Sequence, residues 1–263
     1  MGTVSEGSSN NESEVLVDQR ERILIITINR PKAKNAINAA VSQALAQAMD
    51  RLDEDAGLSV AILTGAGGSF CAGMDLKAFA RGENVVVAGR GLGFTERPPD
   101  KPLIAAVEGY ALAGGTELAL ATDLIVAAND SAFGIPEVKR GLVAGAGGLL
   151  RLPERIPYAI AMELALTGDS LPAQRAHELG LVNVLTEPGA ALDAAIALAE
   201  RITANGPLAV AATKRIITES PGWSRATRFA DQMKVLAPIF GSNDAKEGAI
   251  AFAEKRPPRW TGT

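Results

Sequence analysis

Short apolar runs that alternate with helix-forming segments constrain the fold of this 263-residue chain more than any other feature. The runs are rich in Val, Ile and Leu, as buried strands typically are. They occupy residues 15–18, Ile23–Ile28, 60–64, Leu103–Val107 and Leu124–Ala128. Between them, Asn38 is a suitable N-cap for an amphipathic helix, and a further helix is expected to begin near Gly115. This alternation predicts an α/β fold.

The pattern changes after residue 190, where only helical periodicity is evident. The expected helices are 191–204, 208–219, 224–240 and 244–254. We therefore expect an α/β core over residues 15–190 and a helical C-terminal region over residues 191–263, whose apolar faces meet the core and sister subunits. Residues 1–14 are rich in Ser, Asn, Glu and Gly, so we expect a disordered tail and not a targeting peptide.

Composition excludes several classes of protein. The net charge is −4 with acids and bases interspersed, so no nucleic-acid surface is expected, and no apolar run approaches the ~20 residues of a membrane span. The single cysteine, Cys71, cannot form an internal disulfide, which fits a reducing cytoplasm. The single histidine, His177, is expected on a surface helix, and no nucleophilic serine elbow accompanies it. Neither a metal site nor a Ser-His-Asp hydrolase is therefore expected.

The segment from residue 81 to residue 100 is weakly patterned. It holds four glycines between residues 82 and 93 and a pair of prolines, Pro98 and Pro99. Its length and composition predict a surface excursion near a functional site, outside the core.

Two glutamates carry the strongest chemical signal. Glu117 is followed by Leu118-Ala119-Leu120, and Glu137 follows Ile135-Pro136. A carboxylate in apolar surroundings is costly unless it has a partner or takes up a proton. If both side chains converge on one pocket, they can divide general acid and general base between them.

Glycine-bearing turns near these glutamates predict free main-chain amides. Gly114 and Gly115 stand where a strand gives way to a helix, and Asp75 is a suitable N-cap just after Met74. Each turn taken singly is better explained as a tight strand-to-helix connection, but together with the two glutamates the turns indicate an oxyanion hole made of two amides. Residues 145–150 begin like a dinucleotide-binding loop but lack its last glycine, so no nucleotide cofactor is expected.

These residues together resemble the crotonase superfamily, in particular the enoyl-CoA hydratases. The resemblance runs from about Val15 to Trp260. Its landmarks, in order, are Asn29-Arg30-Pro31-Lys32-Ala33-Lys34-Asn35-Ala36, Phe70-Cys71-Ala72-Gly73-Met74-Asp75-Leu76, Ala113-Gly114-Gly115-Thr116-Glu117-Leu118 and Phe133-Gly134-Ile135-Pro136-Glu137. Relatives share this scaffold across several reactions, so the family is better specified than the reaction.

The resemblance implies a spiral of repeated ββα turns, followed by helices that form homotrimers or dimers of trimers. It implies an acyl-CoA substrate and no separate cofactor, because coenzyme A enters as part of the thioester. The thioester oxygen would accept hydrogen bonds from the amides of Met74 and Gly114. The CoA contacts would be Lys32, Ala33, Ala72, Asp75 and Leu76, with Phe252 and Lys255 reaching the CoA of a neighbouring subunit.

The resemblance also implies the reaction. The two catalytic glutamates of the hydratases fall on Glu117 and Glu137. Glu117 would direct water at the β-carbon of a trans-2-enoyl-CoA, and Glu137 would give a proton to the α-carbon, which yields a 3-hydroxyacyl-CoA in fatty-acid or related acyl-CoA metabolism.

Three alternatives remain open. They are hydration or dehydration of a polar acyl-CoA, as in the crotonobetainyl-CoA hydratases, double-bond isomerisation, and a non-catalytic acyl-CoA-binding protein. Lys34, Met74 and Ala144 depart from the usual hydratase residues and leave the acyl group open. Lys139 and Arg140 are interpreted either as surface charge or as a preference for a polar or anionic acyl group.

Overall fold

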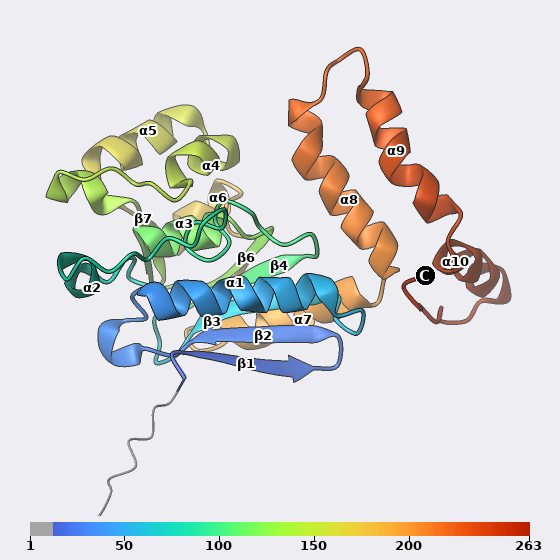
Figure 1. Cartoon of the computed structure of the whole chain (residues 1–263), viewed down its shortest axis with the longest axis horizontal. Helices are drawn as coiled ribbons and strands as arrows, with labels where there is room; N and C mark the ends of the chain where they lie inside the picture. Colours follow the sequence, from blue (N-terminus) through green and yellow to red (C-terminus); the bar gives the residue numbers. More distant parts are fainter. Residues whose placement is uncertain (1–12) are drawn as a thin grey trace, which may run out of the picture.

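A six-stranded sheet forms the centre of the molecule. The computed structural model describes residues 13–263 (Figure 1). The sheet order is β1-β2-β3-β4-β6-β9, with β1 antiparallel to β2 and the remaining pairs parallel. The strands are β1 Val15–Arg20, β2 Ile23–Ile28, β3 Val60–Gly65, β4 Leu103–Val107, β6 Leu124–Ala128 and β9 Val184–Thr186. The α/β class and all five expected strands are confirmed; β9 has only three residues and was not predicted.

A second sheet of three short strands stands next to the first. It contains β5 Tyr110–Leu112, β7 Ala132–Gly134 and β8 Ser170–Pro172, in the order β5-β7-β8. Cys71 extends it through a single bridge to Ala111. The chain thus passes repeatedly from a long strand to a short one and then to a helix, as in β4, β5 and α3 (Gly114–Leu120). This repeated ββα order agrees with the spiral that the resemblance implies.

Helices cover both faces of the large sheet (Figure 1). Helix α1, Ala39–Glu54, packs through Leu45 and Met49 on the face that includes Leu24 and Ile26. Helix α7, Ala191–Thr203, packs on the opposite face, which includes Ile62. The side chain of Asn38 accepts a hydrogen bond from the amide of Val41, which confirms the predicted N-cap.

The C-terminal helices do not form one unit. Helix α7 belongs to the α/β body, whereas α8 Pro207–Glu219, α9 Arg228–Phe240 and α10 Asn243–Glu254 extend away from it (Figure 1). An ion pair of 2.7 Å between Lys214 Nζ and Asp123 Oδ2 joins α8 to the body. The remaining helical segments are η1 Pro31–Ala33, α2 Leu76–Ala80, η2 Pro136–Arg140, α4 Gly148–Arg155, α5 Tyr158–Thr167, α6 Ala173–Glu178 and η3 Ser220–Gly222.

The first described residues are tied to the body. Of the tail expected over residues 1–14, residues 1–12 lie outside the described residues. Glu14 pairs with Arg30 at 2.9 Å and accepts a hydrogen bond from Asn38, so ordered structure begins before the expected boundary. No helix in the part of the chain that the structure describes is long and apolar enough to cross a membrane.

The segment 81–100 was predicted to lie outside the core, and this was wrong. Phe94 is completely buried, and Val85 and Leu92 are nearly so. These three apolar residues pack into the main hydrophobic cluster, which overrides the glycine-rich composition of their neighbours. The expectation that this segment lies near the candidate site is confirmed, because it lines the cavity described next.

Candidate active site

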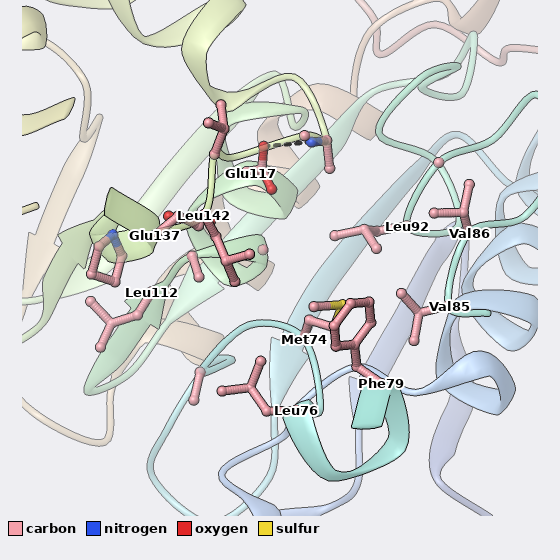
Figure 2. A pocket seen from close by; sticks show the side chains of 18 of the residues that line it. Met74, Leu76, Phe79, Val85, Val86, Leu92, Leu112, Glu117, Glu137 and Leu142 are labelled. Atoms are coloured by element: carbon pink, nitrogen blue, oxygen red, sulfur yellow. Dashed lines mark hydrogen bonds between the residues drawn. The ribbon is translucent and has the colours of Figure 1, made fainter. Parts of the chain in front are cut away.

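A cavity of about 420 Å³ collects most of the candidate residues (Figure 2). Glu117 and Glu137 line it, together with Met74 and Gly114. The rest of the lining is mainly apolar and includes Leu76, Phe79, Val85, Val86, Leu92, Leu112, Leu142 and Val143. An apolar pocket with a few convergent polar groups is the usual form of a small-molecule site.

Glu117 is buried on α3 and is held by main-chain amides. Its Oε1 accepts hydrogen bonds from the amides of Ala146 at 2.7 Å and Gly148 at 2.9 Å. A Cβ at position 148 would lie 2.9 Å from Cγ of Glu117, so only glycine allows this approach. The other oxygen, Oε2, accepts from none of the described residues, which leaves it available to a ligand.

Glu137 lies at the start of η2 in a different environment. Its Oε2 is buried and has no hydrogen-bond partner among residues 13–263. Burial raises the pKa of the Glu137 carboxyl, and the nearby negative charge of Glu117 adds to the increase. Its own backbone amide and the positive charge of Arg140 oppose the increase without cancelling it. This environment therefore favours the protonated form of Glu137.

The amide of Gly114 lies at the first turn of α3, where helical amides have no partner within the helix. Ala113, just before it, has a φ of 51°, a left-handed conformation that non-glycine residues rarely adopt. The next glycine, Gly115, packs so closely on Cys71 that a Cβ would overlap the Cys71 carbonyl oxygen. Strain and close packing thus fix the start of α3 beside the cavity.

The amide of Met74 is presented from the neighbouring loop. On either side of it, the Ile37 amide donates to the Gly73 carbonyl and the Asp75 amide donates to the Ile37 carbonyl, both at 2.8 Å. A Cβ at Gly73 would lie 2.7 Å from Cβ of Ala113, so the two loops are in contact. Neither the Met74 nor the Gly114 amide donates a hydrogen bond to another described residue.

The predicted CoA contacts divide into two groups. Ala72 and Leu76 line the cavity, whereas Lys32, Ala33 and Asp75 do not. The Asp75 carboxylate is occupied, because it pairs with Arg30 and caps α2 through the amides at positions 77 and 78. Its amide is bonded as well, so a contact of Asp75 with CoA would use atoms that are already bonded, and its role there stays a prediction.

The two predicted C-terminal contacts lie far from this cavity. Phe252 and Lys255 are at the end of α10, which stands on the far side of α8 from the body (Figure 1). The side chain of Phe252 is 87% exposed. Within one subunit the structure therefore does not bring these residues to the site.

Sequence reasoning missed part of the site. The apolar wall formed by Phe79, Val86 and Leu142 was not anticipated, and neither were the two amides that hold Glu117. Of these three residues, only Val86 lies in segment 81–100, where the apolar run 85–87 was the available signal. The two adjacent basic residues lie in different places. Lys139 forms a 2.7 Å ion pair with Asp169 on the surface, whereas Arg140 lines the cavity.

The structure also shows where Lys34 and Met74 lie, two residues that differ from those usual in hydratases. Lys34 places its ammonium 5.6 Å from the centre of the half-exposed Tyr110 ring, so a cation–π contact engages it. Met74 turns its side chain into the cavity (Figure 2). There it occupies space that would otherwise be open to an acyl group.

Comparison with known proteins now identifies the family. The sequence profile described as enoyl-CoA hydratase/isomerase matches residues 18–263. Enoyl-CoA hydratase EchA19 of Mycobacterium tuberculosis is 43% identical, over 99% of this chain and 99% of the relative. Carnitinyl-CoA dehydratase of Proteus mirabilis is 42% identical, over 92% of this chain and 96% of the relative. The crystal structure of enoyl-CoA hydratase EchA1 from Mycobacterium marinum is 89% identical, covers 96% of this chain and 100% of that chain, and has a TM-score of 0.95.

The sequence profile, the fold and the similar crystal structures therefore indicate the same family. The α/β spiral with its C-terminal helices is the crotonase fold. The match extends across nearly the whole chain, and it does not depend on the site residues alone. The chain belongs to the enoyl-CoA hydratase/isomerase family of the crotonase superfamily.

Proposed function

We propose that this protein is an enoyl-CoA hydratase, which adds water across the double bond of a trans-2-enoyl-CoA to give a 3-hydroxyacyl-CoA. The observation that carries the proposal is the pair Glu117 and Glu137: two carboxylates in unlike environments that line one apolar cavity. Relatives of this chain that are named enoyl-CoA hydratases support the same reaction.

Glu117 is the general base in this proposal. Hydrogen bonds from the amides of Ala146 and Gly148 fix Oε1 and hold the carboxylate at the cavity. Oε2 then accepts a proton from a water molecule as the water oxygen bonds to the β-carbon.

Glu137 is the general acid. Its raised pKa favours the protonated carboxyl, which supplies a proton to the α-carbon of the substrate. The proton that Glu117 gains and the proton that Glu137 loses balance over the cycle, and exchange with solvent restores both groups.

The free amides of Met74 and Gly114 form the oxyanion hole in this proposal. As water adds, negative charge develops on the thioester oxygen, and each preorganised donor is worth about 3 kcal/mol of barrier height. The adenine and phosphate groups of CoA would contact Lys32, Ala33, Ala72, Asp75 and Leu76. Phe252 and Lys255 would contact the CoA of a neighbouring subunit in a homotrimer or dimer of trimers, which we place in the cytoplasm.

The direct test is product identity. The protein is incubated with trans-2-butenoyl-CoA and longer trans-2-enoyl-CoA thioesters in ¹⁸O-labelled water. Loss of the conjugated enoyl absorbance together with a 3-hydroxyacyl-CoA that carries one ¹⁸O atom is expected. A shifted double bond without mass gain would establish an isomerase, and tight binding without conversion would establish a non-catalytic protein.

A second candidate is hydration of a polar, cationic acyl-CoA. Carnitinyl-CoA dehydratases are 42–44% identical to this chain, and Glu96 is among the residues that line the cavity. A carboxylate and the ring of Phe79 at the cavity offer the chemistry that recognises a quaternary ammonium group. A higher kcat/KM for crotonobetainyl-CoA than for trans-2-butenoyl-CoA would select this candidate.

A further inference from the structure

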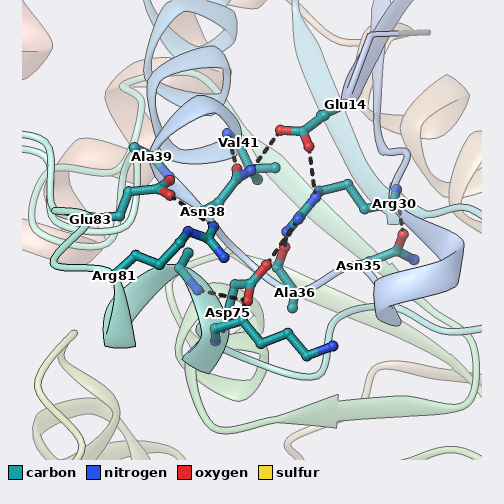
Figure 3. A network of polar contacts seen from close by, with 12 residues as sticks. Glu14, Arg30, Asn35, Ala36, Asn38, Ala39, Val41, Asp75, Arg81 and Glu83 are labelled. Carbon is teal, nitrogen blue, oxygen red and sulfur yellow. Dashed lines mark hydrogen bonds and ion pairs between the residues drawn. The ribbon is translucent and has the colours of Figure 1, made fainter. Parts of the chain in front are cut away.

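Arg30 stands at the centre of a polar network next to the cavity (Figure 3). Its Nη2 pairs with Asp75 Oδ2 at 2.9 Å, and its Nε pairs with Glu14 Oε1 at 2.9 Å. Its Nη1 donates to the carbonyl of Ala36. The Arg30 side chain is only 17% exposed, so all three contacts are made in a largely desolvated position.

Two of these contacts lie on opposite sides of Met74. The carbonyl of Ala36 immediately precedes Ile37, whose amide and carbonyl bond to Gly73 and Asp75. The Asp75 carboxylate immediately follows Met74. The guanidinium of Arg30 therefore holds two segments at once: the one that contains Ala36 and Ile37, and the Met74 loop to which Ile37 is bonded. The Met74 amide, which donates to none of the described residues, lies between two fixed neighbours in a residue that lines the cavity.

The same contact orients part of the apolar wall. Asp75 Oδ1 accepts from the amides of Lys77 at 3.0 Å and Ala78 at 3.1 Å, which caps the five-residue helix α2. A helix this short has little stability of its own. The position of α2 therefore depends on its cap, Asp75, and on Arg30, which holds Asp75. Leu76 and Phe79 of α2 line the cavity.

We infer that Arg30 is a positioning residue for the reaction: through Ala36 and Asp75 it sets the Met74 amide against the developing oxyanion and holds α2 at the acyl pocket. Glu14 orients Arg30 in turn, because it also accepts a 2.8 Å hydrogen bond from Asn38 at the start of α1. The inference rests on the proposed function, since it assigns Arg30 to the same thioester oxygen.

The shape of the guanidinium explains why arginine is required. It is planar and donates in three directions at once, whereas a lysine ammonium is a point charge that cannot span the same three acceptors. Arg30→Lys keeps the charge and removes the bridge. Asp75→Asn keeps an oxygen that can cap α2 and removes the charge that pairs with Arg30.

The experiment compares Arg30→Lys, Asp75→Asn and the double variant with the full-length wild-type protein. The matched control is Arg20→Lys, which alters an exposed ion pair with Glu200 away from the cavity. Two quantities are measured besides turnover: the dissociation constant of free CoA, and the ultraviolet absorbance of the enolate of bound 3-ketobutanoyl-CoA. That absorbance reports how well the oxyanion is stabilised.

In each single variant kcat should fall at least about tenfold, because displacement of a reacting group by about 1 Å costs up to 10²-fold. The enolate absorbance should fall with it, and in Arg30→Lys the affinity for free CoA should change less than about twofold. The double variant should be no slower than the slower single variant, because both changes break one connection. Arg20→Lys should match the wild type.

Two outcomes overturn the inference. One is an unchanged enolate absorbance in Arg30→Lys. The other is an equal loss of CoA affinity and catalysis together with a lower melting temperature, which would show general destabilisation. If the wild-type protein forms the bound enolate but hydrates no enoyl-CoA, the proposed function fails separately. The enolate absorbance of the variants then decides on Arg30 alone.

Discussion

Glu117 and Glu137 line one cavity, but only Glu117 is fixed by main-chain hydrogen bonds to a carboxylate oxygen from other loops. Glu137 has a buried oxygen without a partner and a pKa raised by burial. The two carboxyl groups thus have unlike environments: amides from other loops hold Glu117, and burial favours the protonated form of Glu137. This difference is the physical basis for assigning one as base and the other as acid.

The first prediction concerns the base. Glu117→Gln should lower kcat about 10²- to 10⁴-fold, because a neutral amide cannot take a proton from water. The melting temperature should stay close to that of the wild type, since the amide oxygen can still accept from Ala146 and Gly148. Turnover and thermal unfolding are measured on the same preparation.

The control for this change is Glu178→Gln, which removes the carboxylate from an exposed pair with Arg175. It should leave turnover unchanged. If Glu117→Gln hydrates substrate at a rate near that of the wild type, Glu117 is not the base.

The second prediction concerns pH and stability. The pKa of Glu137 is higher in the folded protein than its ordinary value of 4.5, so the folded state binds more protons and stability falls as pH rises above 4.5. Glu137→Gln, which is always neutral, should therefore unfold at a higher temperature than the wild type near neutral pH. The difference should narrow as pH falls to 4.5 and below.

Asp75 provides a control, because its pKa is shifted in the direction opposite to that of Glu137. Although burial alone would raise its pKa, hydrogen bonds from Arg30 and from the amides of Ala78 and Lys77 hold it below the ordinary value of 3.8. Its contribution to stability is present above pH 3.8 and is lost as pH falls through the lowered value. Asp75→Asn should thus be less stable than the wild type at neutral pH. An identical pH trend in both variants would contradict the assigned shifts.

Much of the fold could be predicted because its signals are local. The strand Ile23–Ile28 is six apolar or β-branched residues in a row, and the caps at Asn38 and Asp75 follow from side-chain oxygens just before a helix. The short strands β5, β7 and β8 could not be predicted, because three residues carry no readable period. They exist because neighbouring turns of the spiral supply their hydrogen bonds.

The candidate site was predictable where the type of a residue itself indicates its chemistry. Glu117, Glu137 and the glycines at 114 and 115 could be found from sequence and resemblance. The amides of Ala146 and Gly148 could not, because any residue has an amide and only the fold brings these two to Glu117. The occupation of Asp75 by Arg30 is likewise invisible in a sequence, since the two lie 45 residues apart.

The third prediction separates two adjacent glycines. At Gly114 an added Cβ would meet the flexible end of Leu92 at 2.9 Å, whereas at Gly115 it would overlap the backbone carbonyl of Cys71. A side-chain tip can move aside and a backbone carbonyl in a sheet cannot. Gly115→Ala should therefore lose about 10²-fold or more in kcat, as when an oxyanion donor is removed, and should unfold at a lower temperature.

Gly114→Ala is the matched comparison for Gly115→Ala. It should keep a melting temperature closer to the wild type and lose less activity, because only Leu92 has to move. Equal damage in both variants would show that the packing on Cys71 does not set the position of α3.

The fourth prediction uses the separation of Lys139 from Arg140. Glu137 must be protonated to act as the acid, so kcat/KM should decline as pH rises through its pKa in the free enzyme. The positive charge of Arg140 lowers that pKa, and its removal in Arg140→Gln should move the decline to higher pH. The matched control is Lys139→Gln, which makes the same change in charge at the adjacent position. Lys139 pairs with Asp169 on the surface and does not line the cavity. The pH profile of Lys139→Gln should therefore match that of the wild type. If both variants move the profile equally, the effect is one of overall charge, and if neither does, the titration does not belong to Glu137.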